Sequence, residues 1–142
     1  MATVVFTRRR NIGSLLLRTF LWSEWSHCGI LYAGKVVEAA AFKGVRVRPL
    51  EEFLADVSKY EVVEFPGASE AIYKAALTQL GKAYDWMGCL GFVARRRWQD
   101  TDKWFCSELI AWAFEKAGLP LFRTDYWRIT PRDLFIAIRR DP

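Results

Sequence analysis

Three residues of this sequence have the side chains that nucleophilic thiol catalysis requires. Cys106 lies in the segment KWFCSELIAWAFEKAG directly before an amphipathic run, His27 is the single histidine, and Glu38 is an isolated carboxylate in KVVEAAA. A cysteine at a helix N-terminus beside an imidazolium has a lowered pKa and is a better nucleophile. The residue types therefore predict Cys106 as nucleophile, His27 as base and Glu38 as the group that orients the imidazole. Backbone N–H groups of the first helical turn could hold the oxyanion.

A hairpin would bring two of these residues together. If Ala33-Gly34 forms a two-residue turn, Tyr32 pairs with Lys35, and Glu38 lies on the same sheet face as His27, one diagonal step away. A buried carboxylate needs a partner, and His27 is then the histidine within its reach. A three-residue loop would break this relation, so the pairing of His27 with Glu38 depends on the turn.

The same residues also have simpler interpretations. A cysteine is often a small buried hydrophobe, and a lone histidine in an apolar strand is often a core residue. The three cysteines, at positions 28, 89 and 106, are odd in number and lack CxxC spacing, so we expect reduced thiols and no disulfide framework. A zinc site is disfavoured because His27 and Cys28 would point to opposite faces of a strand. No metal or cofactor is expected.

The elements that must position these residues alternate between strands and helices. Residues 26–50 read as a strand meander with turns at Gly34 and Gly44. The other patterns predict strands at 2–6, 60–65 and 136–140, and helices at 12–20, 49–57, 68–81, 83–94, 104–117 and from 129 to 135. With no repeats, linker or low-complexity segment, we expect one α+β domain over residues 1–142.

Composition and charge limit the classes of partner that the protein is expected to bind. The chain has 142 residues, 52% hydrophobic and 15% aromatic, and a net charge of +5, with arginine clusters at 8–10, 95–97 and 139–140. These clusters are either solvated surface or a site for an anionic cell-wall or membrane component, and no nucleic-acid motif is present. No segment is apolar enough to span a membrane, and Arg18 interrupts the one stretch that looks like a signal peptide. We expect a cytoplasmic protein as synthesised, which a phage or another route could deliver to the envelope.

Four segments together resemble the NlpC-type papain-like amidohydrolases, in their circularly permuted, YiiX-like branch. They are WSHCGILYAGKVVEAAAFKGVRVRPLEEFL, GKAYDW, WFCSELIAWAFEKAG and ITPRDLF, and they span about residues 10 to 135. In that branch the histidine and its polar partner precede the cysteine, as His27, Glu38 and Cys106 do here. The resemblance implies a papain-like fold, an antiparallel sheet or half-barrel packed against helices, with the nucleophile at the start of a core helix.

The resemblance also implies an activity and further site residues. Tyr84 matches a tyrosine that lines the family's site, and Trp104 and Ser107, beside the nucleophile, are expected to contact substrate. The expected reaction is amide hydrolysis, with a peptidoglycan stem peptide as one substrate. Two alternatives are a lipid acyl hydrolase or acyltransferase of the lecithin:retinol acyltransferase-like type, and a non-catalytic phage or binding module. Cys28 replaces the usual small aliphatic residue, and we expect its side chain to point into the layer opposite His27.

Overall fold

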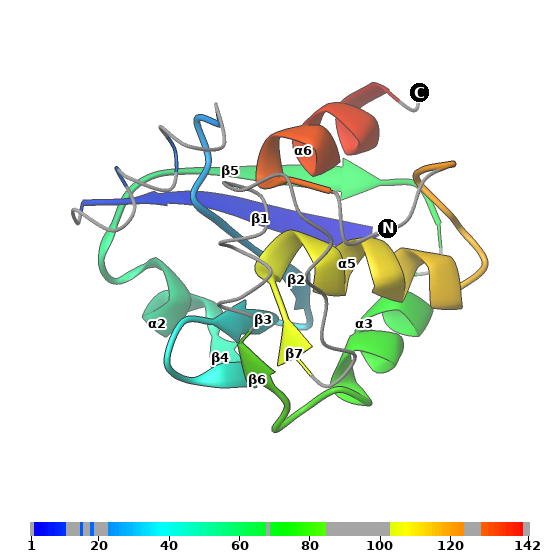
Figure 1. The fold of residues 1–142 in the computed structure, drawn as a ribbon, viewed down its shortest axis with the longest axis horizontal. Helices are drawn as coiled ribbons and strands as arrows, with labels where there is room; N and C mark the ends of the chain where they lie inside the picture. Colours follow the sequence, from blue (N-terminus) through cyan, green and yellow to red (C-terminus); the bar gives the residue numbers. More distant parts are fainter. Residues whose placement is uncertain are drawn as a thin grey trace.

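An antiparallel sheet of five strands forms the centre of the molecule (Figure 1). The computed structural model describes residues 2–10, 15, 18, 23–67, 69–84, 103–123 and 129–140. In spatial order the strands are β4 (Gly44–Pro49), β3 (Lys35–Ala40), β2 (His27–Tyr32), β1 (Ala2–Arg9) and β5 (Val57–Phe65). The described part also contains the helices α2 (Leu50–Leu54), α3 (Ser69–Leu77), α5 (Cys106–Lys116) and α6 (Pro131–Arg140) and a short parallel pair, β6 (Ala83–Tyr84) and β7 (Lys103–Trp104).

The β2–β3 hairpin has the predicted turn and register. Ala33 and Gly34 both have positive φ, 48° and 76°, as a type I′ turn requires, and Tyr32 pairs with Lys35. The pairing continues through Ile30 and Val37. Glu38 therefore lies where the sequence places it, on the same side of the hairpin as His27.

The two faces of the sheet are covered unequally. One face carries the main core, where side chains such as Phe6, Ile30 and Val37 pack against α3, α5 and α6. The other face carries a smaller cluster of Val5, Val36 and Phe53, the last of these from α2. Figure 1 shows α5 lying across the sheet beside α3, with α6 over β5. The site described below lies where the start of α5 reaches β2.

The last segment is a helix, and the strand predicted at 136–140 is wrong. At its start the Thr130 backbone N–H donates to Asp133 Oδ2 at 3.0 Å, and the Asp133 N–H donates to Thr130 Oγ1 at 3.2 Å. These bonds satisfy N–H groups that have no partner in the first helical turn. Leu134 and Ile138 are one turn apart and both buried, whereas Ile136 is only partly buried. The alternation of apolar residues in IAI therefore does not mark a strand, because these residues lie in a helix whose buried side includes Leu134 and Ile138.

Other element boundaries moved by a few residues. The helix predicted at 49–57 covers Leu50–Leu54, because β5 begins at Val57, and the helix predicted at 68–81 ends at Leu77. Residues 83 and 84, expected in a helix, form β6 instead. The predicted helix 12–20 and the rest of 83–94 fall mostly outside the described residues.

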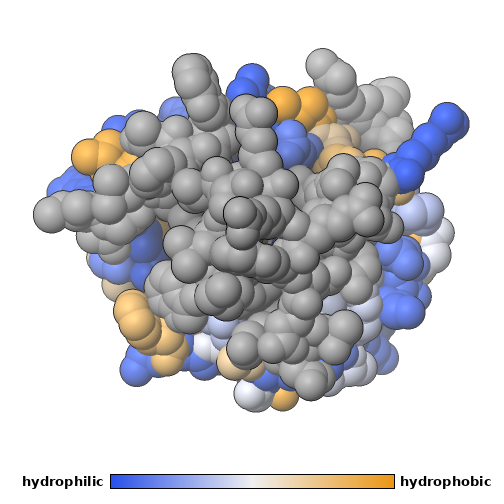
Figure 2. Space-filling model, viewed as in Figure 1, coloured by the Kyte–Doolittle hydropathy of each residue, from blue (hydrophilic) through white to orange (hydrophobic). Residues whose placement is uncertain are grey.

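On the face drawn in Figure 2, most of the described residues in view are hydrophilic. In the space-filling view, hydrophobic residues form small separate groups on the described part of that face (Figure 2). Among the described residues, the large hydrophobic side chains that remain exposed include Phe42, Tyr60 and Val62. In the part of the chain that the structure describes, no helix is both long and apolar enough to cross a membrane.

Candidate active site

Cys106 is the first residue of α5 and is almost fully buried, with 1% of its surface exposed. The preceding Phe105 N–H donates to Glu108 Oε2 at 3.3 Å, which closes the start of the helix. The thiol therefore lies at the positive end of the α5 dipole, where a thiolate is favoured over a thiol.

His27 connects the thiol to the carboxylate. Its Nε2 lies 2.5 Å from Glu38 Oε2, and the ring also makes a hydrogen bond with the Cys106 side chain. Because Nε2 is engaged by Glu38, Nδ1 is the ring nitrogen left for the thiol. His27 begins β2 and Glu38 lies on β3, so the hairpin register decides this contact. The three residues predicted from the sequence are thus brought together in the order Cys106, His27, Glu38.

Two arginines bind the other oxygen of the Glu38 carboxylate. Arg46 Nε donates to Glu38 Oε1 at 2.9 Å, and Arg48 Nε lies 2.6 Å from the same atom. Arg46 is the direct cross-strand partner of Glu38 on β4, and Arg48, two residues on, shares its face. The Glu38 side chain is fully buried, so these cations compensate a charge that water does not reach.

Phe53 packs against both ends of this network. Its ring centre is 5.6 Å from that of His27 and 5.5 Å from the guanidinium carbon of Arg48. Gly29 makes room for Phe53, since a Cβ there would lie 2.4 Å from Val36 Cγ1 and 3.3 Å from Phe53 Cε2. The glycine of the SHCGI segment therefore has a steric role: it allows α2 to hold the imidazole ring in place.

The pKa values of the three residues favour an ion pair. Burial disfavours the ionised forms of all three residues. For Cys106, hydrogen bonds from Cys28 and His27 and the charge of His27 outweigh burial and lower the pKa to about 5. For His27, bonds to Cys106 and Glu38 raise the pKa to about 9. For Glu38, His27, Arg48 and Arg46 lower the pKa to about 2. Between about pH 5 and 9 the site therefore holds a thiolate, an imidazolium and a carboxylate.

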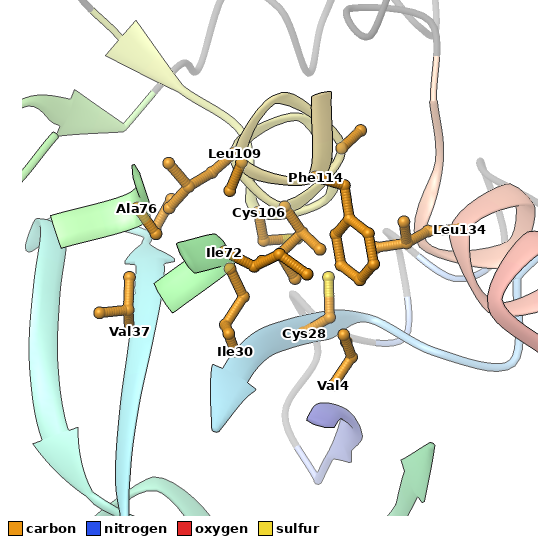
Figure 3. Packing of buried hydrophobic residues seen from close by; sticks show 14 of the residues in the cluster. Val4, Cys28, Ile30, Val37, Ile72, Ala76, Cys106, Leu109, Phe114 and Leu134 are labelled. Atoms are coloured by element: carbon orange, nitrogen blue, oxygen red, sulfur yellow. The ribbon is translucent and has the colours of Figure 1, made fainter. Parts of the chain in front are cut away.

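Cys28 lies closer to the chemistry than the sequence indicated. It does point to the face opposite His27, as predicted, but α5 covers that face, and the Cys28 sulfur points toward α5 (Figure 3). The Cys28 side chain and backbone both hydrogen-bond the Cys106 sulfur. Burial and the neighbouring Cys106 charge raise the pKa of Cys28 well above its ordinary range, so it stays a thiol and donates. The sequence predicted the direction of the Cys28 side chain and did not predict its contact with Cys106.

The predicted substrate-contacting residues are all largely buried. Tyr84 packs edge-on against Phe105, with ring centres 5.8 Å apart. Trp104 Nε1 donates to Gln79 Oε1 at 3.1 Å, and the Ser107 hydroxyl donates to the Ile129 carbonyl at 2.5 Å. The polar groups of Trp104 and Ser107, on either side of Cys106 in the chain, are thus bonded to other residues of the protein. Cys89 lies outside the described residues.

Sequence comparison assigns the chain to a family. Residues 3–126 match the family described as "Permuted papain-like amidase enzyme, YaeF/YiiX, C92 family". The chain belongs to this C92 family. C92 members are described as permuted papain-like amidases, and this chain has a permuted papain-like α+β fold. The permuted order agrees with the position of His27 and Glu38 before Cys106 in the chain.

A solved structure agrees with the C92 assignment. The chain is similar to the crystal structure titled metalloprotein yiiX from Escherichia coli O157:H7, with 25% sequence identity and a TM-score of 0.63. The alignment covers 82% of this chain and 64% of that one, so this chain spans less than two thirds of the length of that relative. None of the curated proteins matches the sequence.

Sequence reasoning missed Arg46, Arg48 and Phe53. A signal was available for the arginines: the short turn before Gly44 pairs β3 with β4, and arginines at alternate positions then face the side that carries Glu38. Phe53 had no such signal, because its contact with His27 depends on how α2 folds back over the sheet.

Proposed function

We propose that this enzyme hydrolyses an amide bond with Cys106 as the nucleophile, His27 as the general acid and base, and Glu38 as the residue that orients His27. The observation that supports this most directly is the chain of contacts from the Cys106 thiol through His27 to Glu38, with Nε2 2.5 Å from Oε2. A nucleophile bonded to a base, which is itself held by a third group, is the arrangement that covalent catalysis needs.

The reaction would run in two halves. The Cys106 thiolate attacks the amide carbon, the carbonyl electron pair moves to oxygen, and the C–N bond then breaks as the leaving nitrogen takes the proton of the His27 imidazolium. A water molecule next gives a proton to neutral His27 and attacks the thioester, which releases the carboxylic acid and restores the thiolate and the imidazolium. Backbone N–H groups in the first turn of α5 are the candidate donors to the oxyanion.

The proposed substrate is a peptide amide in an anionic cell-wall polymer, such as a peptidoglycan stem peptide. The net charge of +5 and the arginines at 8–10 and 139–140 favour an anionic partner. The amide class follows from the family, and the cell-wall substrate rests on the resemblance to NlpC-type enzymes.

The relative's title calls that protein a metalloprotein. We propose no metal in this mechanism, because the donor set does not fit one. Within the described residues, no group of three or more His, Cys, Asp and Glu side chains is placed to hold a metal ion.

The test compares two substrates and three variants. Purified peptidoglycan and, separately, phospholipid vesicles are incubated with the wild type, Cys106→Ala, His27→Ala and the double variant, and products are identified by mass spectrometry. We expect new amino and carboxyl groups from peptidoglycan, a loss of at least about 10³-fold in each single variant, and little further loss in the double variant. Fatty-acid release would favour a lipid substrate instead. Full activity of Cys106→Ala would exclude the proposed nucleophile.

A further inference from the structure

The Glu38 carboxylate has more positive charge around it than its own neutralisation requires. Oε2 faces His27, and Oε1 faces two guanidinium groups, Arg46 at 2.9 Å and Arg48 at 2.6 Å. The imidazolium is shared with the Cys106 thiolate, so one arginine would be enough to balance the carboxylate. Burying an additional cation is costly, and the Arg48 side chain is only 14% exposed. A role limited to structural compensation leaves the second arginine unexplained.

We propose that Arg46 and Arg48 are positioning residues for the Cys106–His27 pair, which act through Glu38 and through the surplus positive charge that they bring to the site. The proposal rests on the proposed function in taking Cys106 as the nucleophile. Neither arginine is required to touch the substrate.

The charges of the site explain what the arginines would do. A thiolate at Cys106, an imidazolium at His27 and a carboxylate at Glu38 leave one surplus negative charge. The two arginines turn this into one surplus positive charge. In a buried site such a change favours every anion, including the thiolate and the oxyanion that follows it, and disfavours the imidazolium. A neutral His27 is also the form that must take a proton from water.

Other titratable groups lie near Cys106, His27 and Glu38. Glu108, in the first turn of α5, is buried and accepts the Phe105 N–H, the Cys28 thiol faces Cys106 from β2, and Tyr84 lies near on β6. On α2, the Glu51 and Glu52 side chains are exposed and therefore screened by water. None of these groups supplies a second cation on Glu38.

Arg48 is also held from several sides. Its Nη1 donates to the Glu52 carbonyl at 3.1 Å, and its guanidinium lies over the Phe53 ring at 5.5 Å. A lysine would keep the charge but could not make this planar set of contacts. A lysine at Arg48 would therefore change the contacts as well as keep the charge, so the variant that keeps the charge is made at Arg46.

The experiment measures ionisation of the thiol and needs no substrate. Arg46→Gln, Arg48→Gln and Arg46→Lys are titrated by the ultraviolet absorbance of the thiolate and by the pH dependence of iodoacetamide labelling at Cys106. In each glutamine variant we expect the titration midpoints of Cys106 and His27 both to rise, that of Cys106 by about one pH unit. At a pH well below the Cys106 midpoint, the labelling rate of Cys106 should then fall about tenfold. Arg46→Lys should keep the wild-type midpoints.

A matched control uses an arginine in an ion pair away from the site. Arg139 lies on α6, 3.5 Å from Glu61, and Arg139→Gln should leave both midpoints unchanged. Unchanged midpoints in folded Arg46→Gln and Arg48→Gln would overturn the proposal, because purely structural ion pairs would lower stability without moving them. An equal shift in Arg46→Lys would also overturn it.

A double variant covers the case in which a glutamine variant does not fold. Glu38→Gln combined with Arg46→Gln removes one charge of each sign, so the surplus positive charge remains. We expect Glu38→Gln alone to lower the Cys106 midpoint and the double variant to restore it toward the wild-type value; a double variant that stays at the lowered midpoint would contradict the proposal. Because these readouts require no turnover, an enzyme inactive on every amide tested would refute the proposed function and leave this inference standing.

Discussion

At the residue scale, the ionisation of Cys106 depends on two neighbours in the sequence that point to opposite sides of one strand. His27 supplies a positive charge and a hydrogen bond, and Cys28 supplies a hydrogen bond from its side chain and another from its backbone. Consecutive residues of a strand rarely serve one atom, because their side chains alternate between faces. Here the start of α5 lies at the point where both are within reach.

The first prediction is that Cys106 reacts before Cys28. Near pH 6 the Cys106 thiol, with a pKa of about 5, is mostly thiolate, whereas Cys28 has a raised pKa and remains protonated. Brief iodoacetamide treatment of the folded protein, followed by peptide mass mapping, should label Cys106 at least about tenfold faster than Cys28. His27→Ala should slow labelling of Cys106 and leave Cys28 unchanged. Equal rates at both thiols would mean that Cys106 is an ordinary core cysteine.

The second prediction concerns Cys28 as a hydrogen-bond donor. Cys28→Val keeps a small apolar side chain but removes the S–H donor, so the pKa of Cys106 should rise from about 5 by roughly one pH unit. Cys28→Ser retains a donor and should shift it less. Thiolate absorbance measured against pH distinguishes the two variants. Identical midpoints in Cys28→Val and the wild type would show that the backbone N–H alone is sufficient.

At the element scale, short connections control the site. The type I′ turn of the β2–β3 hairpin sets Glu38 against His27, and the β3–β4 pairing sets Arg46 against Glu38. Helix α2 then folds back so that Phe53 lies against the imidazole ring. Each step needs a close approach between elements, and at Gly29 that approach leaves no room for a side chain.

A substitution at Gly29 tests this arrangement. Gly29→Ala would place a Cβ 2.4 Å from Val36 Cγ1 and 3.1 Å from the Val37 carbonyl oxygen, so the packing must shift. We expect a loss of about 1–3 kcal/mol in unfolding free energy, together with a changed pH dependence of Cys106 labelling, because Phe53 no longer holds His27. Chemical denaturation and iodoacetamide labelling measure these effects.

The matched control for this variant is Gly34→Ala in the hairpin turn. Gly34 has a φ of 76°, and no atom lies within 4 Å of the position that a Cβ would take, so the substitution adds backbone strain alone. It should lower stability by about 1 kcal/mol and leave Cys106 labelling as in the wild type. If Gly29→Ala also lowered only stability, the proposed link between Phe53 and His27 would be wrong.

At the scale of the whole molecule, the site makes stability depend on pH. The pKa of Glu38 is lowered from 4.5 to about 2, so its contribution is present above 4.5 and is lost as the pH falls toward 2. Cys106, lowered from 9.0 to about 5, makes stability rise with pH between these values. His27, raised from 6.5 to about 9, makes stability fall over that interval. From 6.5 to 9 the last two effects oppose each other, because a proton moves from thiol to imidazole within the protein.

The expected stability profile has two parts. Unfolding free energy should rise as the pH increases from about 2 to 6.5 and then stay nearly level to about 9. The Glu38 part amounts to roughly 3 kcal/mol, from a shift of 4.5 to about 2. Urea unfolding at a series of pH values measures the profile, and Glu38→Gln should flatten its acidic part. A profile in Glu38→Gln with the same acidic slope as the wild type would assign the slope to other groups.

Local patterns in the sequence predicted much of the fold and the three residues of the candidate site. The choice of Cys106, His27 and Glu38 and the turn at Ala33-Gly34 follow from residue type and from contacts between near neighbours in the chain. So does the helix predicted at 104–117, although in the structure it begins at Cys106 because Trp104 belongs to β7. Such features depend on local propensity and register, which a sequence displays directly. The IAI segment marks the limit of this reasoning, because its alternation of two fitted a strand while its buried stripe belongs to α6.

The features that only the tertiary structure decided are contacts between elements distant in sequence. The alternation of β2 correctly separates Cys28 from His27, yet it does not say which face α5 will cover, and that face decides that Cys28 bonds Cys106. The stacking of Phe53 on His27 likewise depends on the path of α2 across the sheet. Side-chain direction is local, but the partner that a side chain meets depends on how the layers pack, and packing is settled by the burial of the whole core.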